Sequence, residues 1–157
     1  MEYDSGRADL TTVFSELIRL ETELWDAVES RVRARRGVTL GSYEVMSVIA
    51  RQPGCRVQDI AGALSITVGG VSKIIDRLEA AGYCTRRPNP ADRRSSVIGL
   101  TPAGAGLVAE LTRTVEDELA RRLGPALSSG SAAELTRTLT RLRSAVRSAG
   151  ADQEAVR

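Results

Sequence analysis

The chain has 157 residues, one domain's worth of sequence, and 42% of them are hydrophobic, which is enough for a buried core. It contains no histidine, and Cys55 and Cys84 are too far apart for CxxC or zinc spacing, so we expect no metal, no cofactor and no enzymatic site. No apolar run approaches the ~18 residues that span a bilayer, and the polar start does not resemble a signal peptide, so we expect a cytoplasmic protein without a membrane partner.

Positive charge is concentrated in one part of the chain. The formal net charge of the whole chain is only +2, but residues 51–94 hold eight basic and four acidic residues, a net of +4. The remainder therefore carries a net of −2. Such a concentration is the footprint of a surface that contacts phosphate groups.

The N-terminal third predicts two helices. The first spans 8–36, where a helical period is kept by Leu10, Val13, Phe14, Leu17, Ile18, Leu24, Trp25, Val28 and Val32, and Gly37 ends it. A helix of this length has more apolar surface than one small domain covers, so we expect it to pack on a second subunit. The next helix is expected over 40–52, with Val45, Val48 and Ile49 inward, before the break at Pro53 and Gly54.

Two short amphipathic helices joined by a tight turn follow from Val57, which predicts a helix-turn-helix. The second has an apolar stripe centred on Val71, Ile75 and Leu78, and its opposite side carries Gly69, Ser72, Lys73, Asp76 and Arg77. A small, hydroxylic and basic face suits the DNA major groove. Gly69 and Gly70 leave two interpretations open: close approach to a DNA strand, or a frayed first turn.

A hairpin is expected after Gly82, which ends the second of these helices. Its strands are predicted at 83–87 and 97–100, with 88–96 as a long charged tip whose sequence is PNPADRRSS. Asp92 is expected to hold one of the two adjacent arginines, Arg93 and Arg94, and leave the other free to enter a minor groove. Helix, turn, helix and basic hairpin in this order predict a winged helix.

Residues 37–108 resemble the MarR (multiple antibiotic resistance regulator) family. Three segments in this order and spacing carry the resemblance: VSKIIDRLEAAG, the hairpin NPADRRSS and the closing LTPAG. The resemblance implies an intertwined twofold dimer, and the family's wing pattern of Asp, any residue, Arg selects Arg94 as the minor-groove reader. It also implies a small aromatic or anionic effector, for which Trp25 and Tyr43 are candidates beside the alternative that both are core or interface aromatics.

Two further helices are predicted after the hairpin. Thr101 and Pro102 begin the first, which runs to Gly124, and Ser131 to Glu134 has the spacing of a capping box at the start of the last, with a loose tail after Gly150. The expected fold is therefore mainly α with a small β-hairpin (α+β), a winged helix-turn-helix flanked by long dimerisation helices. As domains we expect a single unit over 1–157, a DNA-binding region at 38–101 and dimerisation regions at 8–36 and 102–148.

The function predicted from these features is a homodimeric regulator that binds a palindromic site in double-stranded DNA and represses transcription until a small molecule relieves it. The residues expected to contact DNA are Thr67, Gly69, Ser72, Lys73, Arg77, Arg86, Arg87, Asp92, Arg93 and Arg94. The alternative is a winged helix that binds protein, but the hairpin tip lacks the aromatic or aliphatic anchors such contacts use. Cys84 next to Arg86 is either a thiol of lowered pKa or a small core residue.

Overall fold

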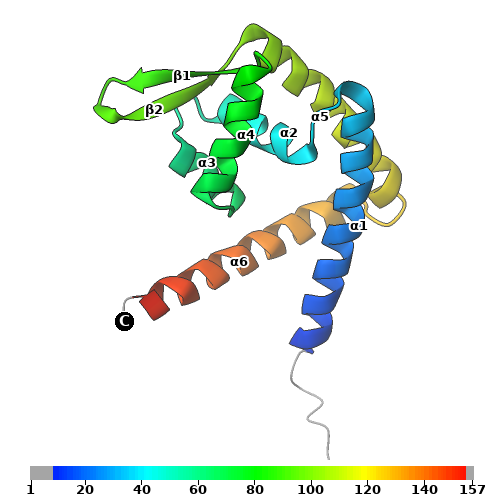
Figure 1. Ribbon diagram of the computed structural model, residues 1–157. Coiled ribbons are helices and arrows are strands. Elements are labelled where there is room, and N and C mark those ends of the chain that lie inside the picture. Colours follow the sequence, from blue (N-terminus) through cyan, green and yellow to red (C-terminus); the bar gives the residue numbers. More distant parts are fainter. Residues whose placement is uncertain (1–8, 155–157) are drawn as a thin grey trace, which may run out of the picture. The chain divides into compact units, whose positions relative to one another are not determined.

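The computed structural model describes residues 9–154, without the side chains of Arg93 and of residues 150–154 (Figure 1). In chain order it contains α1 (Leu10–Arg36), α2 (Leu40–Arg51), α3 (Val57–Leu64), α4 (Val68–Ala80), β1 (Cys84–Asn89), β2 (Asp92–Leu100), α5 (Pro102–Leu123) and α6 (Ser129–Glu154). The chain forms two compact units, the first ending at Glu118 and the second beginning at Leu119, both within α5. The predicted fold class, mainly helical with one antiparallel hairpin, is confirmed.

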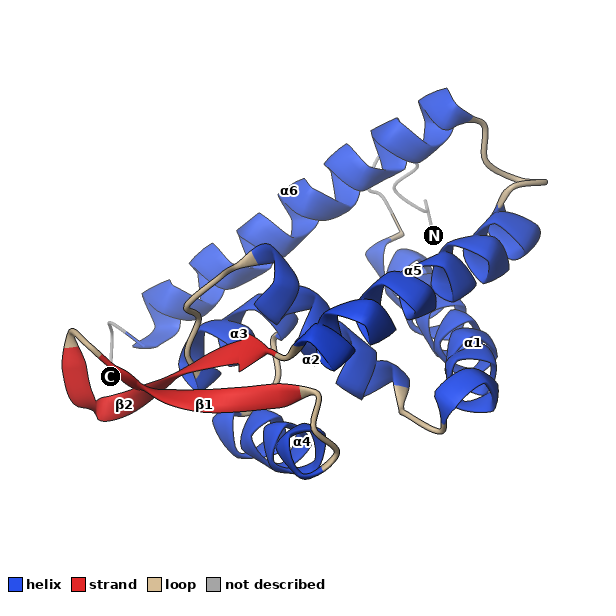
Figure 2. Cartoon of the chain, turned by 90° about the horizontal axis from the view of Figure 1, so that it is seen from above, coloured by secondary structure: helices blue, strands red, loops and turns tan. Residues whose placement is uncertain are grey.

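The core of the first unit lies among α2, α3, α4 and the hairpin. These elements contact one another, and β1 runs across α4 rather than parallel to it (Figure 2). The largest fully buried side chains are Met46, Ile60, Ile75, Ile98, Leu111, Val32, Val45, Val71, Cys55 and Cys84. Aliphatic side chains fill this space because the chain has few aromatic residues, as its composition predicts. The apolar stripe predicted for α4 is confirmed, since Val71, Ile75 and Leu78 are all buried.

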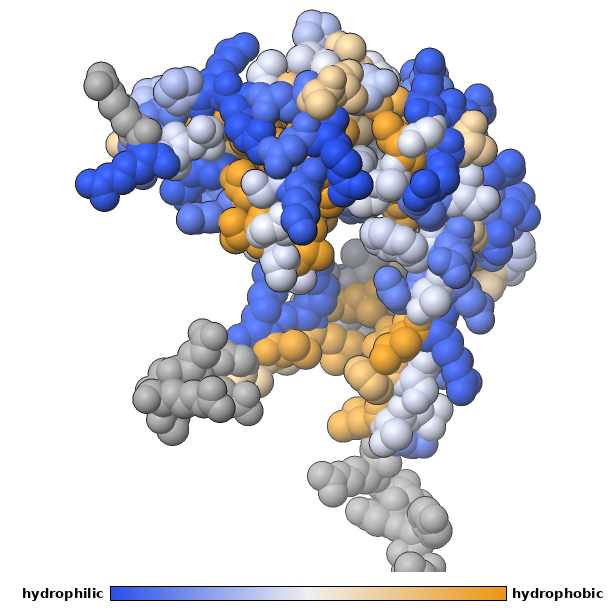
Figure 3. All heavy atoms as spheres, in the orientation of Figure 1, coloured by the Kyte–Doolittle hydropathy of each residue, from blue (hydrophilic) through white to orange (hydrophobic). Residues whose placement is uncertain are grey.

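Helix α1 buries only its C-terminal part. The side chain of Asp9 accepts a hydrogen bond from the backbone of Thr12 at 3.0 Å, and Gly37, in the left-handed region at φ 67°, ends the helix as predicted. Val28 and Val32 are buried. Most of the apolar side chains before them are exposed, and they form a hydrophobic strip along α1 in Figure 3: Leu10, Val13, Phe14, Leu17, Ile18, Leu20 and Trp25.

Two ion pairs join α1 to α5. Arg31 Nε donates to Glu118 Oε2 at 3.1 Å, and Arg36 Nη2 donates to Glu110 Oε2 at 2.8 Å. The hydrogen bonds from Arg36 lower the pKa of Glu110. The Glu118 carboxylate is almost completely buried, so its charge is tolerated only because it is hydrogen-bonded and paired. These contacts place the end of α1 against α5.

The second unit contains the end of α5 and helix α6. The Ser128 side chain caps α6 by accepting from the backbone N–H of Ser131 at 3.3 Å, so the capping box predicted at Ser131 is wrong by one turn. The loose tail predicted after Gly150 is also wrong over 151–154, which remain helical, and its last residues, 155–157, lie outside the described residues. Leu135, Leu142 and Val146 of α6 are exposed.

The hairpin departs from the predicted one because its strands are longer. β1 continues through Pro88 and Asn89, and Pro88 pairs with Ser96. The predicted loop over 88–96 is therefore wrong: a proline removes only its own N–H, and both strands of a two-stranded ribbon are edges, where a proline is tolerated. Asn89 pairs with Asp92, so residues 93–95 form a bulge with no partner opposite them.

Candidate nucleic-acid interface

Helix α4 begins with a cap and two glycines. The Thr67 hydroxyl accepts from the backbone N–H of Gly70 at 3.1 Å, and a Cβ added at Gly70 would lie 3.0 Å from that hydroxyl. Both glycines lie in the first turn of α4, as one of the two interpretations held. A Cβ at Gly69 would meet nothing within 4 Å, so the backbone there is open to a close approach from outside.

The outward side of α4 carries the small and basic residues that the sequence placed there. Lys73 and Arg77 are exposed, and Ser72 is half-buried. Arg77 Nε donates to the Lys73 carbonyl at 3.3 Å, which holds the guanidinium along the helix. Neither cation forms an ion pair with a carboxylate of the described residues.

The end of α4 is fixed in relation to the hairpin and α5. Gly82 has φ 79° and donates to the Glu79 carbonyl at 3.0 Å, while Tyr83 donates to the Leu78 carbonyl at 2.9 Å, which together form a Schellman motif. The Thr101 hydroxyl donates to the Gly82 carbonyl at 2.7 Å and accepts from the Gly104 N–H at 3.0 Å. A Cβ at Gly104 would lie 2.1 Å from the Tyr83 carbonyl oxygen, so only glycine permits this approach.

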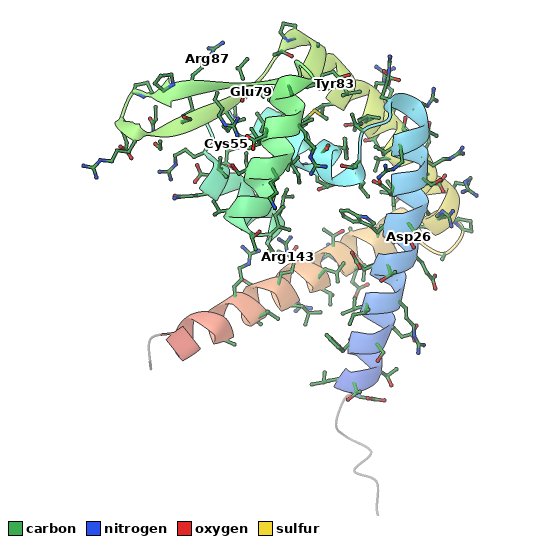
Figure 4. The ribbon with its side chains drawn as sticks, in the orientation of Figure 1. Asp26, Cys55, Glu79, Tyr83, Arg87 and Arg143 are labelled. Atoms are coloured by element: carbon green, nitrogen blue, oxygen red, sulfur yellow. The ribbon has the colours of Figure 1, made fainter. Side chains whose placement is uncertain are left out.

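Arg86, expected to contact the DNA backbone, binds two carboxylates of α4 instead. Its Nη2 lies 2.5 Å from Asp76 Oδ1, its Nη1 pairs with Glu79, and its backbone N–H donates to Glu79 Oε1 at 3.2 Å. Burial lowers the pKa of Arg86, but these two partners outweigh burial and the pKa is raised overall. Its side chain is only 28% exposed. Arg86 therefore clamps β1 onto α4 and neutralises the acidic charge of Asp76 and Glu79. Of these three residues, Glu79 is labelled in Figure 4.

Arg87, the next residue of β1, is exposed and projects away from the hairpin in Figure 4. At the bulge, Asp92 Oδ1 accepts from the backbone N–H of Arg94 at 3.0 Å, so Asp92 shapes the backbone of the tip and leaves the Arg94 side chain unpaired. Asn89 Nδ2 donates to Ser95 Oγ at 2.9 Å, which closes the base of the tip. The Arg94 side chain is exposed, whereas that of Arg93 lies outside the described residues.

A hollow of about 430 Å³ lies between α3, α4 and the hairpin. Its lining includes Arg86, Asp92 and Arg94, and four residues that the sequence did not single out: Arg56, Gln58, Ser95 and Ser96. Arg56 Nε donates to Asp59 Oδ2 at 3.1 Å, and the hydrogen bonds from Arg56 lower the pKa of Asp59. The sequence carried one signal for Arg56, a basic residue immediately before a helix, but it was not assigned to the site.

The two aromatic candidates for an effector site differ. Tyr43 is 8% exposed, and its hydroxyl lies 3.2 Å from the Thr112 hydroxyl of α5, so it is a core residue with a satisfied polar group. Trp25 is exposed on α1. Neither residue lines the hollow beside α4. Tyr43 is therefore a core aromatic residue, which was the alternative to a role in an effector site.

Both cysteines are buried core residues. Burial raises the pKa of Cys84 to about 11, in spite of the nearby Arg86, and burial also raises the pKa of Cys55. Cys84 is therefore a small core residue rather than a thiol of lowered pKa. The Cys55 carbonyl accepts from the Ile98 N–H at 2.8 Å and so ties the segment before α3 to β2. Within residues 9–154, no cluster of candidate metal ligands and no membrane-spanning helix is found.

These elements define a winged helix-turn-helix: α3 and α4 joined by a three-residue turn, with the β1–β2 hairpin as the wing. Residues 38–96 match the model of the MarR family. The resemblance recognised from the sequence is therefore confirmed over these residues.

Known proteins similar to this chain agree with that identification. A putative transcriptional regulatory protein for the hcr operon of Thauera aromatica is 31% identical over 84 residues, which is 54% of this chain and 51% of that protein. The chain thus spans about half the length of this relative.

Two solved structures show the same fold. Sco3205, a MarR family regulator from Streptomyces coelicolor in complex with DNA, has a TM-score of 0.80 at 20% identity, over 89% of this chain and 92% of that one. BpsR of Bordetella bronchiseptica, whose DNA binding is regulated by 6-hydroxynicotinic acid, has a TM-score of 0.75 at 23% identity, over 84% and 98%.

Proposed function

We propose that the protein is a homodimeric transcriptional regulator that binds a palindromic site in double-stranded DNA. In each protomer α4 enters the major groove, and the wing enters the adjacent minor groove. Residues 38–101 form the DNA-binding region, and 8–36 with 102–148 form the dimerisation region.

One observation carries this proposal: two cations on the outward side of α4 and two on the wing are exposed and unpaired within the described residues. Lys73, Arg77, Arg87 and Arg94 make no ion pair with a described carboxylate. By contrast, Arg33 and Arg36 at the end of α1 each bind one. Unpaired cations at the recognition elements are available to phosphate groups without first breaking an internal contact.

The residues proposed to contact DNA fall into three groups. Gly69, Ser72 and Lys73 face the major groove, and Thr67 lies at the leading end of α4. Arg77 and Arg87 contact phosphate groups. Arg94 reads the minor groove together with Arg93, while Asp92 holds the tip in shape and Arg86 positions the wing by binding α4. The hollow lined by Arg56 and Arg94 is proposed to receive the phosphate backbone that separates the two grooves.

A second copy of the chain is proposed to cover the apolar strip of α1. Phe14 is 64% exposed, and it lies among six other exposed apolar side chains on the same helix. Soluble monomers rarely leave a contiguous apolar surface of this kind open to water. A twofold dimer also holds two recognition helices at a fixed separation of one helical turn of DNA, about 34 Å.

The regulator is proposed to act as a repressor that a small aromatic or anionic molecule relieves by changing the separation of the two recognition helices. BpsR, with the same fold, supports the existence of such an effector. A ligand acts in this way only if it binds one spacing more tightly, which typically couples the two sites by about 1 to 3 kcal/mol.

Enrichment of genomic duplex fragments by the purified full-length protein tests this function. We expect a palindromic duplex to be enriched, a single strand of the same sequence to bind more weakly, and sedimentation equilibrium to give a dimer. A protein that stays monomeric, or that binds no duplex at low ionic strength, would contradict the proposal.

A further inference from the structure

The N-terminal (leading) end of α4 exposes apolar side chains rather than hydrogen-bonding groups. Ile66 and Val68 are 43% and 51% exposed, although the other large apolar residues of the helix-turn-helix are buried or half-buried. Both lie next to Thr67, the N-cap of α4. Gly69 follows with no side chain at all. Four consecutive exposed residues, 66–69, therefore form an apolar leading edge.

Thr67 does not interrupt this edge. Its hydroxyl is committed to the N–H of Gly70, 3.1 Å away inside the first turn. The γ-methyl group of a threonine points in a different staggered direction from its hydroxyl, so Thr67 can also present a methyl group at this edge. The Thr67 hydroxyl accepts from Gly70 and keeps its O–H as a donor.

Of the side chains that read purines through paired hydrogen bonds, the first two turns of α4 contain only Lys73. They contain no asparagine, glutamine or arginine; the polar side chains there are Ser72, Lys73 and the capping Thr67. Arg77 comes one turn later and lies along the helix. A recognition helix meets base edges mainly with its N-terminal residues, and here those residues are aliphatic.

The surroundings of the leading edge favour DNA over protein as its partner. Val68 lines the hollow together with the unpaired Arg94 and with Arg56 and Arg86, which are paired with carboxylates, so the apolar side chain borders a charged surface whose free charge is positive at Arg94. In the major groove, the C5-methyl group of thymine is the one apolar feature of the base edges. A pair of branched aliphatic side chains among cations is complementary to thymine methyl groups flanked by phosphates.

We infer that Val68, flanked by Ile66 and the Thr67 methyl group, recognises a thymine methyl group in each half-site of the DNA. Specificity at that position is for A·T base pairs with thymine on the strand that faces α4. This inference rests on the proposed function, and it adds a chemical basis for how the protein recognises its DNA site. Val68 is a specificity-determining residue in this scheme.

The test replaces thymine by uracil, which lacks only the C5-methyl group and keeps every hydrogen-bonding group. The probe is the duplex of highest affinity that the full-length protein selects from a randomised pool, made once with thymine and once with uracil. Burying one methyl group changes affinity about fourfold, so we expect the uracil duplex to bind about fourfold more weakly for each half-site, and about fifteenfold for a palindrome.

Val68→Ala supplies the matched control. This variant should bind the two duplexes equally, because the side chain that senses the methyl group is gone. Its affinity for the thymine duplex should fall to that of the wild type for the uracil duplex. Circular dichroism melting and sedimentation should be unchanged, since Val68 is half exposed and alanine suits a first helical turn.

Five results would overturn the inference. Equal binding of the two duplexes by the wild type would show that no methyl group is read, with the proposed DNA-binding function left standing. Persistent discrimination by Val68→Ala would place methyl recognition on another residue. An equal loss on both duplexes would assign Val68 to sugar contacts, and a changed oligomeric state would assign it to a protein interface. Selection of no duplex at all would remove both this inference and the proposed function.

Discussion

The winged region and helix α1 use the same kinds of side chain in opposite ways. In the winged region the apolar stripe of α4 formed by Val71, Ile75 and Leu78 is buried, and several cations are exposed and unpaired. In α1 the apolar side chains are mostly exposed, while Arg31, Arg33 and Arg36 are paired with carboxylates. The winged region thus completes its core within one chain and keeps unpaired cations at its surface. Helix α1 pairs three of its arginines and keeps an exposed apolar strip, which the proposed dimer would cover.

The largest expected effect breaks the core of the winged region. Ile75 is completely buried, so Ile75→Ala should lower the free energy of unfolding by about 2 to 5 kcal/mol, independently of protein concentration. Denaturant unfolding at two protein concentrations measures this. Ile18→Ala is the matched control in α1, where the side chain is exposed.

We expect Ile18→Ala to weaken dimerisation instead, so that its effect on the unfolding midpoint grows as the protein is diluted. A concentration-independent loss for Ile18→Ala, equal to that for Ile75→Ala, would show that the two regions do not differ in this way.

The next effect concerns the wing. Arg94→Ala should weaken binding of the selected duplex by about 1 to 3 kcal/mol, because an exposed arginine at the bulge is lost from the groove. The melting temperature should not change, since the contact of Arg94 with Asp92 uses its backbone N–H. Arg113→Ala, which removes an exposed arginine of α5, controls for net charge. Equal losses for both variants would mean that the wing does not read DNA.

A smaller effect is expected at the clamp between α4 and β1. Arg86→Gln leaves Asp76 and Glu79 unneutralised beside the proposed DNA surface, so DNA binding should weaken about tenfold or less. Because these groups are partly exposed, the free energy of unfolding should fall by no more than about 1 kcal/mol.

Adding Asp76→Asn to Arg86→Gln tells a positioning role from a direct contact. If Arg86 acts by neutralising carboxylates, the double variant should recover part of the lost affinity, as read by fluorescence anisotropy. If it stays as weak as Arg86→Gln, Arg86 touches phosphate itself, and the assignment made from the sequence would stand.

The smallest effect is expected at Lys73. Lys73→Ala should reduce the slope of log affinity against log salt by about one unit if the ammonium group contacts a phosphate. Titrations at several salt concentrations give this slope. An unchanged slope combined with relaxed base preference would place Lys73 on a base edge.

Much of the fold could be predicted because local chemistry determines it. Gly37 and Gly82 end helices in the left-handed conformation that glycine adopts most readily, and Thr101 with Pro102 begins α5. The period of Val71, Ile75 and Leu78 predicted the buried side of α4 correctly. Each of these signals lies within one turn of the element that it controls.

The candidate site was less predictable because it depends on partners far along the chain. Arg86 meets Asp76 and Glu79 only because the Schellman turn brings β1 back across α4. Asp92 bonds a backbone N–H because a bulge places it opposite Asn89. Arg56 lines the hollow through the folding of α3 against the hairpin. No spacing of residues in the sequence predicts these contacts directly.

The positions of the helices and the hairpin, the residues of the core and the region of positive charge could be predicted from the sequence alone. They could be predicted because helix propensity, capping residues and hydrophobic period act over only a few residues. Which arginines stay unpaired and can contact DNA depends on the tertiary structure. Packing joins a guanidinium to any carboxylate that it brings within reach, and that depends on the path of the whole chain.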